Sequence, residues 1–100
     1  MVVWTDNAIS HITEFIDDAK VGTEETAKEY MNRLVDYADI LQQMPKLGKK
    51  VETNVGNYEI RQMIYKKHRI IYQIKENDTI ILAVLHTRLD ITKVLKKLKK

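Results

Sequence analysis

The sequence predicts one α+β domain, residues 1–100, in which an N-terminal helical hairpin packs on a mostly antiparallel sheet. Two changes of pattern predict this fold. Between residues 8 and 41, apolar residues recur every three or four positions, which is the period of amphipathic helices. Between residues 58 and 86 they alternate or form a continuous run, which is typical of strands. The predicted order is β-α-α-β-β-β-α, and the last element is a short C-terminal helix.

The chain is expected to begin with a strand at Val2–Trp4, because this short segment is apolar and β-prone. A helix should follow, since Thr5 or Asp6 can offer a side-chain oxygen to the free N–H groups of its first turn. Its apolar stripe consists of Ala8, Ile9, Ile12, Phe15, Ile16 and Ala19. Gly22 lies just past the helix, where a positive φ is often needed.

A second helix is predicted to start at Thr23, which can cap it. Glu24 and Glu25 would lie favourably against its N-terminal dipole. Its stripe consists of Ala27, Tyr30, Met31, Leu34, Ala38 and Leu41. Pro45 should stop the helix. Because the turn at residues 21–22 is short, the two helices should form an antiparallel hairpin.

Residues 45–57 carry turn formers and no helical period, so we expect a loop there. The first strand after this loop should span residues 58–65, in which Tyr58, Ile60, Gln62 and Ile64 alternate with the other residues. Residues 66–68 are polar and predict a turn.

A second strand is predicted at residues 69–75, and it should place Ile70, Tyr72 and Ile74 on one face. After a hairpin turn at residues 76–78, the nearly continuous apolar run 79–86 predicts a central, buried strand. Asp90 can cap the last short helix. The inward-facing residues of that helix would be Val94, Leu95 and Leu98.

Composition excludes several classes of protein. The chain has no cysteine, which excludes a disulfide scaffold and a zinc site built on thiolates. Three scattered histidines are too few for a His-rich metal cage, so we expect neither a metal nor another cofactor. No apolar run approaches the roughly 20 residues that span a bilayer, and no signal-peptide pattern opens the chain. We therefore expect a cytoplasmic protein that does not contact membranes.

Charge is divided unevenly along the chain. Residues 1–40 hold three basic and nine acidic residues, whereas residues 41–100 hold fourteen basic and five acidic residues. This asymmetry predicts an acidic part that faces water and a basic part that is available to an anionic partner. The alternative is that the lysines, including those at the C-terminal end, only keep the domain soluble.

Several short motifs follow one another along the chain. They are the opening Trp4-Thr5 with Ala8, Met44-Pro45 with Gly48, Arg61 on the first strand of the segment 58–90, His68-Arg69-Ile70-Ile71-Tyr72, and the strand ending Val84-Leu85-His86 with Arg88 and Asp90. With these motifs, the segment 58–90 resembles the core of the RelE/ParE toxin superfamily. These pieces cover nearly the whole chain. The resemblance implies a type II toxin that a partner antitoxin holds inactive. It also implies that the chain could form a homodimer or a toxin–antitoxin hetero-oligomer.

The superfamily has two activities. A resemblance to RelE-like members implies a ribosome-dependent endoribonuclease that cuts mRNA. A resemblance to ParE-like members implies a poison of DNA gyrase. For a RelE-like chain the resemblance implies the catalytic residues Arg61, Arg69, His86 and Arg88. However, one lysine position of the nuclease pattern holds Glu59, and residues 91–100 lack the terminal tyrosine.

The segment 85–90 and the opening Trp4-Thr5 are more similar to ParE-like members, so we expect a gyrase poison without chemistry of its own. A ribonuclease remains the alternative, and so does a relative that has lost its activity and only binds a partner. The candidate target-binding residues are Arg61, Tyr65, Lys66, Lys67, Arg69 and Arg88. The arginines have a structural alternative, since they could pair with acids such as Glu59. The catalytic candidate His86 could likewise be a structural histidine that bonds to backbone.

Overall fold

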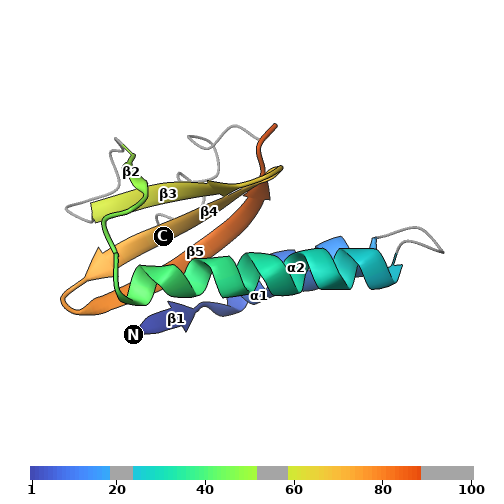
Figure 1. The fold of residues 1–100 in the computed structure, drawn as a ribbon, viewed down its shortest axis with the longest axis horizontal. Coiled ribbons are helices and arrows are strands. Elements are labelled where there is room, and N and C mark those ends of the chain that lie inside the picture. The colour runs from blue at the N-terminus through green and yellow to red at the C-terminus, as the bar shows by residue number, and fades with distance from the viewer. Residues whose placement is uncertain (19–23, 52–58, 89–100) are drawn as a thin grey trace.

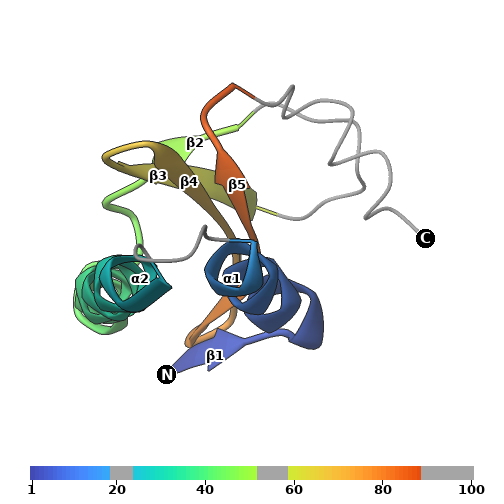
Figure 2. The same ribbon diagram turned by 90° about the vertical axis from the view of Figure 1, so that its right-hand side faces the viewer.

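The structure, a computed structural model, describes residues 1–18, 24–51 and 59–88. In this part of the chain, five strands form one sheet. They are β1 (Val2–Trp4), β2 (Lys49–Lys50), β3 (Glu59–Tyr65), β4 (His68–Lys75) and β5 (Asp78–His86). The strand order is β1-β5-β4-β3-β2, and both helices cover the same face of the sheet (Figures 1 and 2). Only β1 and β5 pair in parallel, so the predicted helical hairpin on a mostly antiparallel sheet is confirmed.

The first helix, α1, spans Asp6–Asp17, and its N-cap is Thr5. The Thr5 hydroxyl accepts a hydrogen bond from the Ala8 N–H at 3.2 Å, which satisfies one free donor of the first turn. The same hydroxyl donates to the Ile81 carbonyl at 2.8 Å. The cap therefore also fixes the start of α1 against β5.

The second helix, α2, spans Glu24–Ala38, and a 3₁₀ turn, η1, continues it over Asp39–Gln42. The α-helix thus ends three residues before the predicted Leu41, because the last turn tightens. Leu41 itself is fully buried, as its place in the apolar stripe predicts. Among the described residues, no helix is long and apolar enough to cross a membrane.

Two sequence-based expectations were wrong near the sheet edge. Lys49–Lys50 lies in the predicted loop but forms β2, which pairs with Gln62 and Arg61. Two residues carry no periodicity, so only the tertiary pairing reveals this strand. His68 was expected in a turn, but it begins β4 and is buried. The turn has only two residues, and Lys66 takes a φ of 52° in it. The predicted C-terminal helix lies outside the described residues.

The core lies between the sheet and the helices. Its buried members are Ala8, Met31, Leu34, Ala38, Leu41, Met63, Ile70, Tyr72, Ile81 and Val84. Ile74 packs against them, which confirms that Ile70, Tyr72 and Ile74 share a face. The opposite face of the sheet carries a second buried cluster of Ile60, Ile71, Ala83 and Leu85. Both faces of the central strands are therefore apolar.

Strand β5 lies between β1 and β4, as its apolar run predicts. Its pairing with β4 contains a bulge, since Tyr72 pairs with Ile81 and Ile71 pairs with Ala83. Leu82 is the extra residue, so the alternation of side chains changes phase there. This phase change places Ile81 and Val84 in the same core.

A buried tyrosine holds the loop between η1 and β2. The Tyr72 hydroxyl donates to the Pro45 carbonyl at 2.7 Å and accepts the Gly48 N–H at 2.8 Å. A Cβ on Gly48 would lie only 2.5 Å from that hydroxyl oxygen. Only glycine therefore fits at this close approach.

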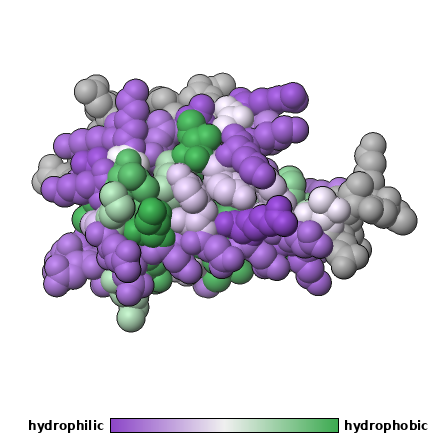
Figure 3. Space-filling view, in the orientation of Figure 1, coloured by the Kyte–Doolittle hydropathy of each residue, from purple (hydrophilic) through white to green (hydrophobic). Residues whose placement is uncertain are grey.

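The surface over α2 is mostly polar, but it carries an apolar patch near the C-terminal end of α2 (Figure 3). The large apolar side chains that are exposed in this segment are Tyr37, Ile40, Met44 and Leu47.

Candidate functional site at the β3–β4 turn

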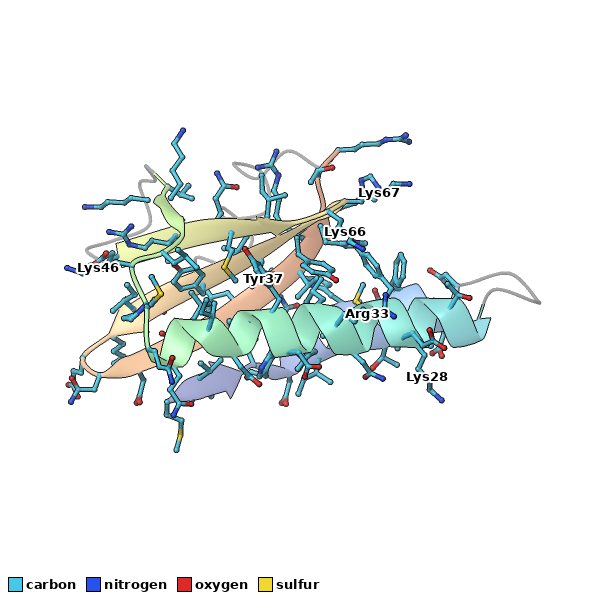
Figure 4. All side chains as sticks on the ribbon, in the orientation of Figure 1. Lys28, Arg33, Tyr37, Lys46, Lys66 and Lys67 are labelled. Carbon is cyan, nitrogen blue, oxygen red and sulfur yellow. The ribbon has the colours of Figure 1, made fainter. Side chains whose placement is uncertain are left out.

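Five of the predicted site residues lie at one end of the sheet. Tyr65 ends β3, Lys66 and Lys67 form the two-residue turn, and His86 and Arg88 lie at the end of β5. The Thr87 N–H donates to the Lys67 carbonyl at 2.9 Å, which joins the turn to the end of β5. Both lysines are exposed at the tip of the hairpin (Figure 4).

An aromatic cluster lies beneath this turn and connects it to both helices. The Tyr30 hydroxyl from α2 lies 2.8 Å from His68 Nδ1 and 3.2 Å from the Tyr65 carbonyl, to which it can donate. The Phe15 ring of α1 meets the His68 ring edge to face, with 4.9 Å between centroids. The His68 and His86 rings are 5.6 Å apart. Packing of rings from four elements gives the cluster a defined geometry.

Burial shifts the pKa values of two groups in this cluster, His68 and Tyr30. It lowers the pKa of His68, and the neighbouring His86 lowers it further, so His68 is neutral at pH 7. Burial also raises the pKa of Tyr30, although the Lys67 N–H opposes that shift. His86 Nδ1 accepts the Arg88 N–H at 3.1 Å, which assigns the ring proton of the neutral imidazole to Nε2.

A cavity of about 570 Å³ opens between the turn and the helices. Its described lining consists of Phe15, Asp18, Thr26, Ala27, Tyr30, Lys66, Lys67, His68 and His86. This volume lies within the range of about 300–1,000 Å³ that is usual for ligand sites. Mainly apolar walls with a few polar groups at one side are also typical of such sites.

Arg61 lies at the other end of β3, about 13 Å from Tyr65 at the usual rise per residue. Its Nε donates to Glu59 Oε2 at 2.7 Å, and a terminal nitrogen donates to the Gly48 carbonyl at 2.7 Å. This pairing also lowers the pKa of the Glu59 carboxyl. Arg61 therefore forms an ion pair with Glu59, which is the structural alternative to target binding that the sequence suggests. It also connects β3 to the loop before β2.

Arg69 lies on the opposite face of the sheet from Arg61. Arg61 pairs with the core residue Tyr72, whereas Arg69 pairs with Ile64 on one side and Leu85 on the other. Paired residues share a face, so the two guanidinium groups project to opposite sides. Arg69 donates to Gln62 Oε1 at 2.7 Å. Its buried Nε has no hydrogen-bond partner among the described residues.

Sequence reasoning missed the helical contribution to this site. Phe15 and Tyr30 belong to the apolar stripes of the two predicted helices and are not among the predicted site residues. Tyr37 was missed too, and its ring lies 5.3 Å from that of Tyr65. Arg33, one turn before Tyr37, adds a cation on α2 (Figure 4). The four-residue spacing of Arg33 and Tyr37 was the available signal, because it places them on one helix face.

The described ranges contain no group of three His, Asp or Glu side chains that could hold a metal ion. In the described part of the chain, the turn end of the sheet brings together the ammonium groups of Lys66 and Lys67, the guanidinium of Arg88, the imidazoles of His68 and His86, and the phenols of Tyr30 and Tyr65. These groups can bind anions and stack on planar groups.

Comparison with known proteins agrees with this fold. The model of the ParE toxin of type II toxin–antitoxin systems, parDE, matches residues 2–91. No curated protein matches the chain in sequence.

Two solved structures are similar in fold. One is the chromosomal ParDE system from P. aeruginosa, with a TM-score of 0.67, 17% identity, and coverage of 85% of this chain and 92% of that chain. The other is the heterotetrameric YoeB–YefM toxin–antitoxin complex from Staphylococcus aureus. Its TM-score is 0.57 at 15% identity, and it covers 86% of this chain and 94% of that chain.

Proposed function

The chain belongs to the ParE family of type II toxin–antitoxin toxins, and on that basis we propose that it arrests growth by poisoning DNA gyrase until an antitoxin binds it. The toxin acts in this proposal as a binding module that holds gyrase on broken DNA. Its contact surface is the exposed turn end of the sheet, which carries Lys66, Lys67, Tyr65 and Arg88.

One observation supports a binding module over a ribonuclease. Metal-free RNA cleavage needs several groups around one phosphate: a base, an acid and cations for the developing charge. Arg61 and Arg69 project from opposite faces of the sheet, and Arg61 is engaged by Glu59 and Gly48. They cannot hold the same phosphate without a change of fold.

The proposal is tested by a gyrase supercoiling assay with the purified toxin, in which both relaxed and cleaved plasmid are measured. We expect inhibition with an increase in cleaved DNA, and the cognate antitoxin should relieve both effects. The double variant Lys66→Glu, Lys67→Glu should weaken inhibition, because it reverses two exposed charges on the contact surface. The matched control is Lys28→Glu, Lys75→Glu, which makes the same charge change elsewhere and should leave inhibition intact.

Gyrase that stays active in the presence of a growth-arresting toxin would overturn the proposal. The observation that then favours a ribosome-dependent ribonuclease is the adjacency of His86 and Arg88 at the end of β5. Cleavage of mRNA on ribosomes would be assayed next, with His86→Ala and Arg88→Ala as the variants. Expression without antitoxin that does not slow growth would instead indicate a relative that only binds a partner.

The antitoxin is the partner that this proposal requires. Both similar solved structures come from toxin–antitoxin systems, and the second is a heterotetrameric complex. We propose a toxin–antitoxin hetero-oligomer here as well. The measurement is the mass of the co-expressed complex in solution.

A further inference from the structure

The cavity at the β3–β4 turn has walls suited to a flat apolar group. Phe15 and Tyr30 are tilted by 40° with 5.8 Å between centroids, and Ala27 lies in the lining between helix and turn. The His68 ring stands edge to face against Phe15. Aromatic rings favour such tilted and edge-on neighbours, so a further ring would find both faces and edges to pack against.

The polar groups in the lining favour an anion. Among the described lining residues, Lys66 and Lys67 contribute two ammonium groups, and Asp18 contributes one carboxylate. Lys66 is held near the Tyr65 ring, with its Nζ 5.6 Å from the ring centroid. The assigned tautomer of His86 adds an Nε2–H donor to the same lining.

We propose that this cavity binds a small aromatic acid: its ring packs against Phe15 and Tyr30, and its carboxylate contacts Lys66 and Lys67. Neither the aromatic ring nor the carboxylate alone would satisfy all the groups that line the cavity. A bare inorganic anion would leave the apolar walls unfilled, and a neutral aromatic ring would leave the lysines without a counter-charge. The site does not depend on gyrase being the target.

The test uses the full-length toxin labelled with ¹⁵N and a matched pair of probes, naphthalene-2-carboxylate and naphthalene-2-carboxamide. Amide shifts are followed as each probe is added. We expect the carboxylate to bind at least tenfold more tightly than the carboxamide. Its shifts should centre on Phe15, Ala27, Tyr30, residues 66–68 and His86.

Variants separate the two parts of the site. Lys66→Gln with Lys67→Gln should weaken the carboxylate at least fivefold and leave the carboxamide unchanged. The control, Lys49→Gln with Lys75→Gln, removes two exposed lysines outside the cavity and should change neither affinity. Ala27→Leu should fill the cavity and weaken both probes. If Ala27→Leu does not fold, the two lysine double variants still test the proposal. All four of these lysine side chains are exposed, so their substitution should leave the fold intact.

Equal affinity for the two probes would overturn the proposal, as would shifts that map away from the cavity. An unchanged carboxylate affinity in the Lys66, Lys67 variant would overturn it too. Since gyrase is absent from the experiment, its outcome is separate from that of the supercoiling assay.

Discussion

Tyr72 shows how one hydroxyl can fix a loop. It is fully buried, burial raises its pKa, and both of its hydrogen-bond partners, Pro45 and Gly48, lie in the loop before β2. Arg61 contacts the same loop through the Lys46 and Gly48 carbonyls. A residue expected to bind a target therefore also supports a loop of the sheet edge.

Tyr72→Phe should lower the free energy of unfolding by about 1–3 kcal/mol, because it leaves the Gly48 N–H and the Pro45 carbonyl without their partner. Urea denaturation followed by circular dichroism measures this loss. Tyr37→Phe is the control, since Tyr37 is partly exposed and should change stability far less. A Tyr72→Phe variant as stable as the parent would show that water replaces the lost hydroxyl.

Gly48→Ala tests the same contact from the other side. The added methyl would lie 2.6 Å from the Gln62 carbonyl and 2.5 Å from the Tyr72 hydroxyl. We expect a loss of about 1–3 kcal/mol, as for other overpacked sites. In the double variant Gly48→Ala, Tyr72→Phe the two losses should add incompletely, since both break one contact. Full additivity in thermal unfolding would contradict this coupling.

At the scale of elements, imidazole groups join helices to the sheet. His68 at the start of β4 contacts Tyr30 of α2, and His11 of α1 accepts the Val84 N–H of β5 at 3.2 Å. Burial lowers the pKa of both histidines, although Glu14 opposes the shift at His11. These two contacts are therefore made by neutral rings.

Stability should consequently fall as the pH drops below 6.5, the ordinary pKa of histidine. Just below that pH, His11 and His68 become protonated in the unfolded chain, whereas in the folded protein they remain neutral. Lowering the pH therefore favours the unfolded state. Above pH 6.5 both states are neutral, and the effect vanishes. Urea unfolding at pH 7.5, 6.5 and 5.5 measures the slope. His68→Gln should flatten the slope, and a slope unchanged by this variant would contradict the assignment.

The element patterns that could be predicted were those set by local periodicity. The stripes of α1 and α2 and the shared face of Ile70 and Tyr72 follow from spacing alone. The faces of Arg61 and Arg69 do not, because they depend on the length of the turn between the strands. A three-residue turn at 66–68 would have placed both on one face, whereas the real two-residue turn pairs Tyr65 with His68 and separates them.

The candidate site was predictable only in its sheet residues. Lys66, Lys67 and His86 stand out as polar groups at strand ends. Phe15 and Tyr30 do not, since an apolar stripe looks the same whether it faces only the core or also a cavity. Their role depends on packing between α1, α2 and the turn, which no local pattern records.

At the scale of the molecule, the N-terminal strand closes the fold. β1 pairs in parallel with β5, so the first residues of the chain lie beside residues 79–81. Val2 and Trp4 pack against the core, whereas Val3 between them is exposed. Without β1, β5 would become an open edge of the sheet.

Trp4→Ala should therefore lower the free energy of unfolding by about 2–4 kcal/mol, somewhat less than a fully buried tryptophan would lose. Val3→Ala on the outer side of the same strand should cost under about 0.5 kcal/mol. Guanidinium unfolding of both variants measures the difference. Similar losses at the two positions would show that β1 contributes through its backbone pairing alone.

The bulge at Leu82 lets β5 carry one extra residue without disturbing the pairing on either side of it. Deleting Leu82 would restore regular pairing, because Ile81 and Ala83 already pair with the adjacent residues Tyr72 and Ile71. Val84 would stay opposite Ile70 in the core, and His86 would stay opposite His68. Related sequences can therefore differ at this point in residue number as well as in residue type and still keep both ends of β5 in register.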